Sequence, residues 1–288
     1  MADWINILVQ GALLGGLYAL FAIGLSLSFG IMRLVNIAHG DLIVLAAYVA
    51  LVTIDATGLN PLASLVVVVP VMGALGYLLQ RGLLNFTLSG GLLPPLLVSF
   101  GISVIIENLL LEGFGARTQR LQAGMIETQS VQWGGIALGV YPLIVFATAV
   151  IAIAALQLLF YRTALGRAFR ATSDDAETAE LMGVDNRHLF ATAMAIAMVF
   201  TALAGVLMAI RTTFDPAAGP ARLIFAFEAV IIGGLGSLWG TLLGGMVLGI
   251  AQAIGAALSP TWQILAGHIA FLVILVIRPS GLAPRTRD

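Results

Sequence analysis

Acidic and histidine side chains that interrupt long apolar runs are the first candidates for chemistry in this sequence. Glu107 and Glu228 lie inside such runs, Asp41 begins another, and His268 lies within a fourth. Placing a charge in a bilayer costs at least about 2.5–3.5 kcal/mol, so these side chains are expected to bond to another helix or to face a path for a polar solute. They are few and scattered, which argues against a relay of carboxylates coupled to protons or sodium.

Several reaction classes are excluded by residue types that the sequence lacks. Binding of ATP by a P-loop needs a lysine, and the chain has none, so any ATP must be bound by another subunit. There is no cysteine for a thiolate site, and His39, His188 and His268 are too far apart in sequence for a metal-binding pair. We therefore expect no enzyme activity, no metal and no cofactor in this chain.

The composition predicts a membrane protein. Of the 288 residues, 60% are hydrophobic and 9% are charged, whereas soluble domains carry about 25% charged residues. The net charge of −1 argues against a nucleic-acid partner. We expect one all-α, polytopic domain over 1–288 with about eight to nine transmembrane helices, some broken or re-entrant. The expected spans are 5–30, 40–57, 62–80, 94–113, 140–160, 189–210, 223–238, 241–258 and 262–277.

The arginines set the expected orientation of these spans. Nine arginines fall on one side and four on the other, so the positive-inside rule makes the first side cytoplasmic. The nine are Arg33, Arg81, Arg162, Arg167, Arg170, Arg187, Arg278, Arg285 and Arg287, and the four are Arg117, Arg120, Arg211 and Arg222. The N-terminus is then outside, the C-terminus is cytoplasmic, and 114–139 is the largest external piece.

Two stretches predict helix breaks. The first is NIAHGD at 36–41, and the second is the glycine-rich run at 227–249. Irregular backbone at membrane depth is tolerated where it is buried in protein or lines a cavity, and half-helix ends near the midplane often form a transport path. The alternatives are a plain cytoplasmic loop for the first stretch and tight helix packing for the second. The candidate path residues are Asn36, His39, Glu107, Glu228, Gly233, Gly234, Gly236 and Ser237.

A charged segment at 161–189 is the longest polar stretch of the chain. Ser173 or Asp174 is expected to cap a short helix that ends at Gly183, with acids in its first turn. A helix of two to three turns is unstable alone in water, so it must lie against something. It either packs on its own spans and the lipid headgroups or docks on a partner protein.

Three sequences carry a resemblance to a known family. GRAFRATSDDAETAELMGVD at 166–185 is similar to the cytoplasmic coupling segment of the branched-chain amino acid ABC transporter permeases. NIAHGD and GGLGSLWGTLLGGMVLG resemble two further patterns of that family, in the family's order, and the likeness extends over essentially the whole chain. The chain resembles the shorter, H-type inner-membrane subunit rather than the longer M-type.

The resemblance implies a permease of an ATP-driven importer in the bacterial inner membrane. Its expected partners are a second, related permease, two cytoplasmic ABC ATPase subunits that bind the ATP, a periplasmic solute-binding protein and membrane lipid. The resemblance implies that the segment couples to the ATPase through Gly166, Arg167, Arg170, Asp174, Ala176, Glu177, Ala179, Leu181, Met182 and Gly183. The expected cargo is a branched-chain or other neutral amino acid. Urea, short amides or another small polar solute are alternatives, as is a stand-alone ion-coupled transporter or channel.

Overall fold

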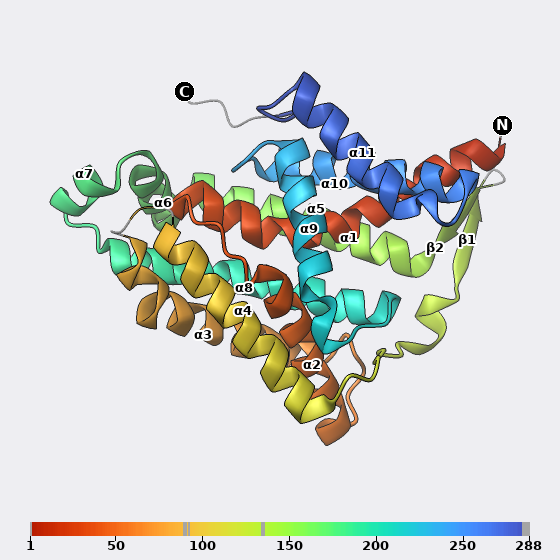
Figure 1. Cartoon of the computed structure of the whole chain (residues 1–288), viewed down its shortest axis with the longest axis horizontal. Helices are drawn as coiled ribbons and strands as arrows, with labels where there is room; N and C mark the ends of the chain where they lie inside the picture. The colour runs from red at the N-terminus through yellow and green to blue at the C-terminus, as the bar shows by residue number, and fades with distance from the viewer. Residues whose placement is uncertain (1, 89–90, 92, 134–135, 284–288) are drawn as a thin grey trace.

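The chain folds as a helical bundle in its computed structural model, which describes residues 2–88, 91, 93–133 and 136–283 (Figure 1). Arg285 and Arg287 lie outside the described residues. The α-helices are α1 Ala2–Met32, α2 His39–Thr57, α3 Leu65–Gly82, α4 Leu93–Phe114, α5 Val140–Arg162, α6 Ala164–Asp174, α7 Ala176–Leu181, α8 Asn186–Arg211, α9 Gly219–Gly233, α10 Leu238–Leu258 and α11 Trp262–Ile277. Short 3-10 turns are η1 Leu84–Phe86, η3 Gly124–Glu127 and η4 Pro216–Ala218, and the strands are β1 Ser130–Trp133 and β2 Ile136–Gly139.

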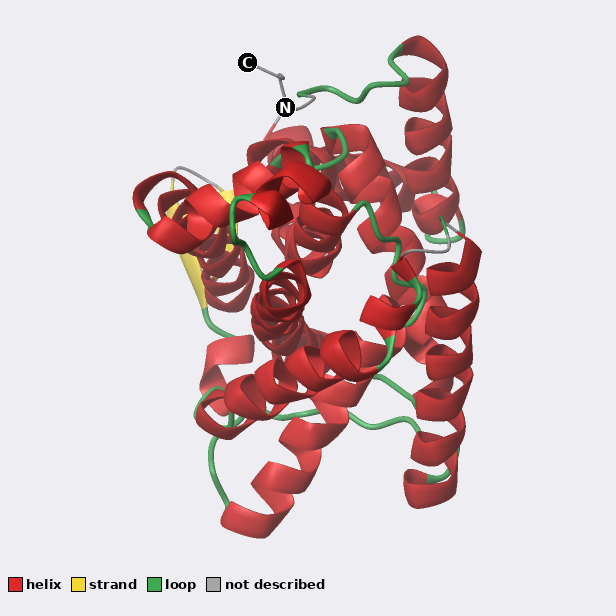
Figure 2. Cartoon of the chain, turned by 90° about the vertical axis from the view of Figure 1, so that its left-hand side faces the viewer, coloured by secondary structure: helices red, strands yellow, loops and turns green. Residues whose placement is uncertain are grey.

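Eight helical segments in the described residues are long and apolar enough to cross a membrane. They are α1, α2, α3 with η1, α4, α5, α8, α9 with η4, and α10. The ninth expected span is α11, which has 16 residues and is shorter. The all-α membrane fold and the expected number of helices are therefore confirmed. We call the end that carries α6 and α7 the α7 end, and the end that carries β1 and β2 the hairpin end (Figures 1 and 2).

The core is built around α1 and α8, whose apolar stretches are mostly buried inside the protein. Helix α1 packs on α10 through two small-residue pairs, Gly11 and Gly15 on α1 and Gly245 and Gly249 on α10. A Cβ at any of the four would overlap the backbone of the other helix. Each pair has the four-residue spacing that lets membrane helices approach closely. Glycine contacts, as well as hydrophobicity, therefore determine how α1 and α10 pack on each other.

The break between α1 and α2 lies deep in the bundle. The chain leaves α1 at Arg33, which has a φ of 51°, and α2 begins beside the middle of α1. His39 Nε2 lies 2.7 Å from the carbonyl oxygen of Phe21, and Gly40 packs on the backbone of Gly219 at the start of α9. The surface-loop alternative for 36–41 is therefore wrong. Asp41 lies in the first turn of α2, and its carboxylate accepts a hydrogen bond from Ser103 of α4 at 2.5 Å.

The break between α9 and α10 is formed by glycines. Gly234 and Gly236 have φ values of 105° and 78°, which residues with a Cβ rarely adopt. The backbone groups freed by the break are bonded, as a membrane interior requires. Leu282 and Ala283 donate their N–H groups to the carbonyls of Ile232 and Gly233, at 2.8 and 3.0 Å. The predicted break in the glycine-rich run is confirmed, and it shortens the seventh span to end at Gly233.

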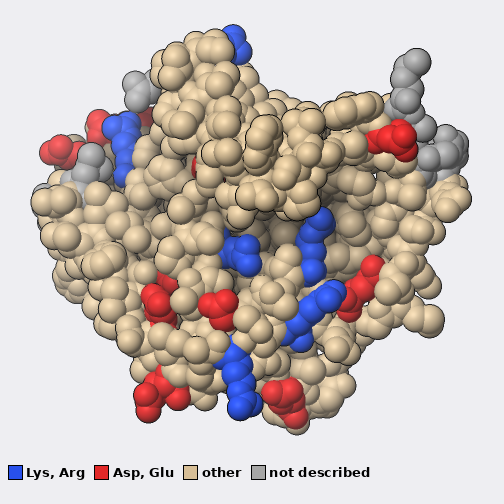
Figure 3. Space-filling model, turned by 45° about the vertical axis from the view of Figure 1, so that its right-hand side comes forward, with Lys and Arg blue, Asp and Glu red and all other residues tan. Residues whose placement is uncertain are grey.

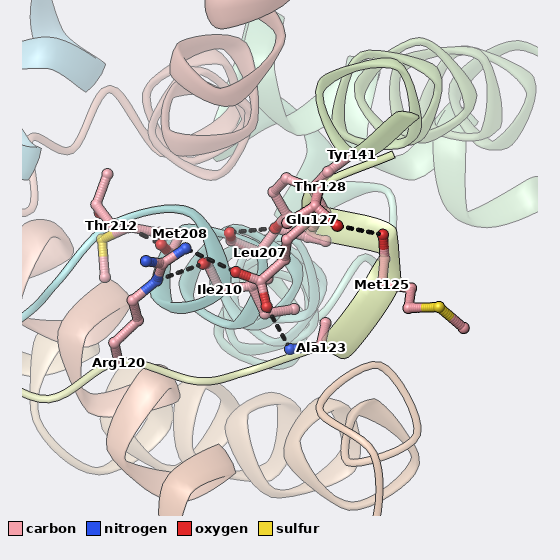
Figure 4. A network of polar contacts seen from close by, with 10 residues as sticks. All are labelled: Arg120, Ala123, Met125, Glu127, Thr128, Tyr141, Leu207, Met208, Ile210 and Thr212. Atoms are coloured by element: carbon pink, nitrogen blue, oxygen red, sulfur yellow. Dashed lines mark hydrogen bonds and ion pairs between the residues drawn. The ribbon is translucent and has the colours of Figure 1, made fainter. Parts of the chain in front are cut away.

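The hairpin end is covered by residues 115–133 and 136–139, for which the sequence predicted no structure. Strands β1 and β2 pair antiparallel, with Val131 opposite Leu138. Figure 4 shows how this cover is attached to the end of α8. Arg120 donates to the carbonyl of Ile210 at 3.2 Å and pairs with Glu127 at 2.6 Å. The Tyr141 hydroxyl donates to the carbonyl of Leu207. These bonds fix α5 and α8 relative to each other.

Candidate functional site

The predicted coupling segment forms two helices, α6 and α7, rather than one. Thr163 caps α6 by accepting a hydrogen bond from the Gly166 N–H at 3.0 Å. Asp175 then adopts an extended φ of −151° and caps α7 by accepting from the N–H groups of Glu177 and Thr178, at 3.0 and 3.1 Å. The cap was predicted at Ser173 or Asp174, so the start of the helix is shifted by one residue or more. The stop at Gly183, with a φ of 89°, is confirmed.

Helix α6 is anchored on the end of α5. Phe169 is fully buried, and its ring lies 5.6 Å from that of Phe160. Gly166 has no room for a Cβ because the carbonyls of Leu159 and Phe160 lie against it. Arg170 donates to the Phe160 carbonyl, and its guanidinium lies 5.2 Å from the Tyr161 ring centre. Arg170 therefore holds α6 to α5, while Arg167 is exposed.

Helix α7 presents an apolar tip. Leu181 and Met182 are 83% and 82% exposed, whereas Ala179 is buried against the protein. The Asn186 side chain donates to the carbonyl of Ala176 at 2.6 Å and ties α7 to the start of α8. Asp174, Glu177 and Gly183 are exposed, and Ala176 is half-buried. The segment thus offers two large apolar side chains, surrounded by charged ones, at the far tip of the molecule (Figure 1).

A testable prediction concerns the Asp175 cap. The hydroxyl and N–H of Thr178 hold the pKa of Asp175 below its usual value. The capped form is therefore present at neutral pH and is lost only as the pH falls through this lowered pKa. Asp175→Ala should speed hydrogen exchange of the α7 amides, whereas Asp175→Asn should keep them protected because asparagine also caps. Equal exchange in the wild type and the alanine variant would contradict the cap.

A cavity of about 1270 Å³ lies beside α6. It is lined by the ends of α1 and α5, by α6 and by the turn between α9 and α10. The Ser173 hydroxyl donates to the Gly30 carbonyl at 2.7 Å, and Gly30 packs on Gly236 in the glycine turn. Trp239 donates its indole N–H to Gln157 of α5. Helix α6 is thus bonded to the end of α1, which faces the glycine turn between α9 and α10.

The predicted path residues divide into separate groups. Gly236 and Ser237 line the cavity, and Gly233 and Gly234 are buried at the contact of α9 with α10 and with the C-terminal segment. Glu107 is half-buried and lies within electrostatic reach of Asp41.

The other three make bonds inside the protein. Asn36 is buried and accepts from the Ala38 N–H at 3.1 Å, which holds the turn before α2. His39 holds the start of α2 to α1. Glu228 is buried and pairs with His268 of α11. These bonds are structural, and Glu228 is also near enough to Tyr18 to act on its hydroxyl.

A group of polar side chains between the middle of α1 and the hairpin end was not predicted as a site. The Tyr18 hydroxyl donates to Gln252 Oε1 at 2.5 Å, and the charges of Arg211, Arg222 and Glu228 all act on this hydroxyl. The sequence places both arginines in a short connection, where they served only to assign an orientation. The sequence did contain a signal for a basic site here, because 211–222 holds two arginines and only one acid, Asp215.

Comparison with known proteins settles the family. Residues 7–277 match the family model described as the branched-chain amino acid transport system permease component. The chain belongs to this permease family. The resemblance drawn from the three sequence patterns is thereby confirmed, and it covers nearly the whole bundle described above.

Relatives of this permease include BraD of Pseudomonas aeruginosa, a high-affinity branched-chain amino acid transport system permease protein. The two are 28% identical over 96% of this chain and 95% of BraD. LivH of Escherichia coli K12 is 27% identical over 96% of this chain and 94% of its own length. LivM of the same organism is 30% identical, but over only 44% of this chain and 30% of LivM. No solved structure matches the chain.

Proposed function

We propose that this permease is the membrane subunit of an ATP-driven importer for branched-chain or other neutral amino acids. The observation that carries the proposal is the α6–α7 pair, which extends from the bundle and ends in the exposed side chains of Leu181 and Met182. Its relatives BraD and LivH are named as branched-chain amino acid permeases, which supports this choice of cargo over urea or short amides.

The partners follow from the same reasoning. LivH and LivM are both named as permease proteins of a high-affinity branched-chain amino acid system, so we expect a second, LivM-like permease beside this chain. Two ABC ATPase subunits would receive the α7 tip in a groove and bind the ATP, since this chain has no lysine for a P-loop. A solute-binding protein would deliver cargo to the hairpin end.

The arginine distribution supports one orientation in the bacterial inner membrane. Arg162, Arg167, Arg170 and Arg187 gather at the α7 end, which would be cytoplasmic. The N-terminus and the hairpin would then face the periplasm, and the C-terminus the cytoplasm. The cavity of about 1270 Å³ would open toward the cytoplasm.

Motion of the ATPases would reach the path through the contacts of α6. A displacement of α7 moves α6, because Asp175 is the only residue between them. Ser173 pulls on Gly30 at the end of α1, and Gly30 lies against Gly236 in the break between α9 and α10. Such contacts connect the ATPase groove to the lining of the cavity, and alternating access needs this connection.

Reconstitution tests the proposal. Vesicles that contain both permeases and the ATPases should take up labelled leucine only with ATP and the solute-binding protein present. Excess unlabelled valine should compete, whereas urea and acetamide should not. Leucine flux through the purified permeases without ATPases would instead show a channel or an ion-coupled transporter.

A further inference from the structure

A recess at the hairpin end contains basic side chains. Figure 3 shows them inside the hollow, with acidic side chains around it. Arg211 is the last residue of α8, and Arg222 lies in the first turn of α9. Both are half-buried, and both act electrostatically on the hydroxyl of Tyr18. Two cations from different helices therefore meet near one point on α1.

Neither cation forms a close ion pair within the described residues, although Asp215 is near enough to act electrostatically on Arg222. Among the residues that the structure describes, no carboxylate lies within 4.0 Å of either guanidinium. Nη1 of Arg211 and Nε of Arg222 are buried and have no hydrogen-bond partner. A buried donor without a partner is unfavourable, and more so when it is charged. Unpaired guanidinium donors of this kind favour a group that carries negative charge.

An acidic group and an aromatic ring stand on the other side of Tyr18. Glu228 accepts from His268 through Oε1, while its Oε2 is buried without a partner. Phe225 lies between them, with its ring 5.1 Å from that of Tyr18 and 6.4 Å from that of His268. Gln252, which accepts from Tyr18, keeps a buried amide donor free. Donors, an acceptor and an apolar surface therefore lie together in one group of residues around Tyr18.

We propose that this recess binds the zwitterion of an α-amino acid during transport. Arg211 and Arg222 hold the carboxylate, Glu228 accepts from the ammonium through Oε2, and Phe225 contacts the apolar side chain. Guanidinium groups bind carboxylates in this way through paired, charge-assisted hydrogen bonds. The assignment rests on the proposed function and adds the residues that recognise the cargo. It also predicts that solutes lacking either charge, such as amides and fatty acids, bind poorly.

The first test measures uptake by the full transporter in vesicles. Arg211→Gln and Arg222→Gln should each lower the kcat/KM of leucine uptake by about tenfold to a hundredfold, mainly through KM. Arg222→Lys should restore part of the loss, and Arg117→Gln, an exposed arginine at the same end, should behave as the wild type. Unchanged KM in both glutamine variants would overturn the site. A wild type that takes up no leucine would instead overturn the proposed function.

The second test reads binding without turnover. The chain has no cysteine, so Thr213→Cys, an exposed position beside the recess, supplies a unique thiol in this subunit. In the complex without solute-binding protein, leucine should slow alkylation of this thiol. Leucinamide and 4-methylpentanoate should protect it at least about tenfold less well, because each lacks one charge. Equal protection by all three would overturn the assignment. The assignment would also be overturned if leucine gave the thiol no protection and the Arg211→Gln and Arg222→Gln variants failed to assemble with the partner permease. In that case the two arginines would pair with the partner permease and not with the cargo.

Discussion

Gly233→Ala should lower the stability of this permease by about 3 kcal/mol, the upper end of the usual cost of overpacking. A Cβ at Gly233 would overlap the carbonyl of Gly240, and one at Gly240 would overlap Gly233. Both obstacles are backbone atoms, which cannot rotate away. We expect a fall of about 6–12 °C in the thermal midpoint of the purified complex and a lower yield of monodisperse protein.

Gly101→Ala is the matched control. Gly101 is also in a membrane helix, α4, but a Cβ there would meet nothing within 4 Å. Alanine favours a helix over glycine by about 0.5–1 kcal/mol, so this variant should be as stable as the wild type or slightly more stable. If the Gly233→Ala and Gly101→Ala variants have the same thermal midpoint, the close contact of α9 and α10 does not determine the stability of the permease.

Replacement of Leu181 and Met182 by aspartate should stop transport. Both side chains are largely exposed at the α7 tip, where an apolar groove of the ATPase is expected to bury them. Truncation of such a central contact usually costs 2 kcal/mol or more, which corresponds to a loss of at least about thirtyfold in affinity. We expect leucine uptake in vesicles to fall at least about tenfold, together with weaker co-purification of the ATPases.

Met125→Asp provides the comparison for this pair. Met125 is 77% exposed, but it lies in η3 at the hairpin end. The charge is added to a side chain of similar exposure on the opposite side of the membrane, so the ATPases should still co-purify. Loss of the ATPases in both variants would point to a general defect in folding and would remove the evidence for docking at α7.

The sequence predicted most spans because about 20 apolar residues in a row permit few other structures. Runs such as 140–160 and 189–210 correspond closely to α5 and α8. How deep in the bundle a helix begins could not be predicted in the same way, because that depth depends on tertiary contacts. Nothing local shows that His39 bonds to Phe21 in the middle of α1, so a plain cytoplasmic loop remained an alternative for 36–41.

A short helix was predicted within the charged segment 161–189, but its division into α6 and α7 was missed. Ser173, Asp174 and Asp175 can all cap a helix, and the choice depends on the extended backbone of Asp175. In the sequence, Arg167 and Arg170 look equally able to contact a partner protein, because both are arginines that precede the predicted helix. Only packing shows that Arg170 is held by Phe160 and Tyr161, whereas Arg167 remains exposed.

The recess at the hairpin end could not be read from the sequence, because its members come from four helices. Tyr18, Arg222 and Gln252 are more than 200 residues apart at the extremes, and charge counting placed the arginines in a loop. Their role depends on the lack of a carboxylate within ion-pair distance of either guanidinium among the described residues, which no linear pattern records. A site built from unpaired groups is visible only when every neighbour is known.

The most direct test of the account is a cross-link between α7 and the ATPase. With a single cysteine from Leu181→Cys and a scan of single cysteines around the ATPase groove, the account predicts rapid disulfide formation at neighbouring positions. The cross-linked complex should neither take up leucine nor show hydrolysis stimulated by the binding protein, and reduction should restore both. Met125→Cys should form no such link. Absence of a link from Leu181→Cys to any groove position, in a complex that transports normally, would contradict the coupling role of α6 and α7.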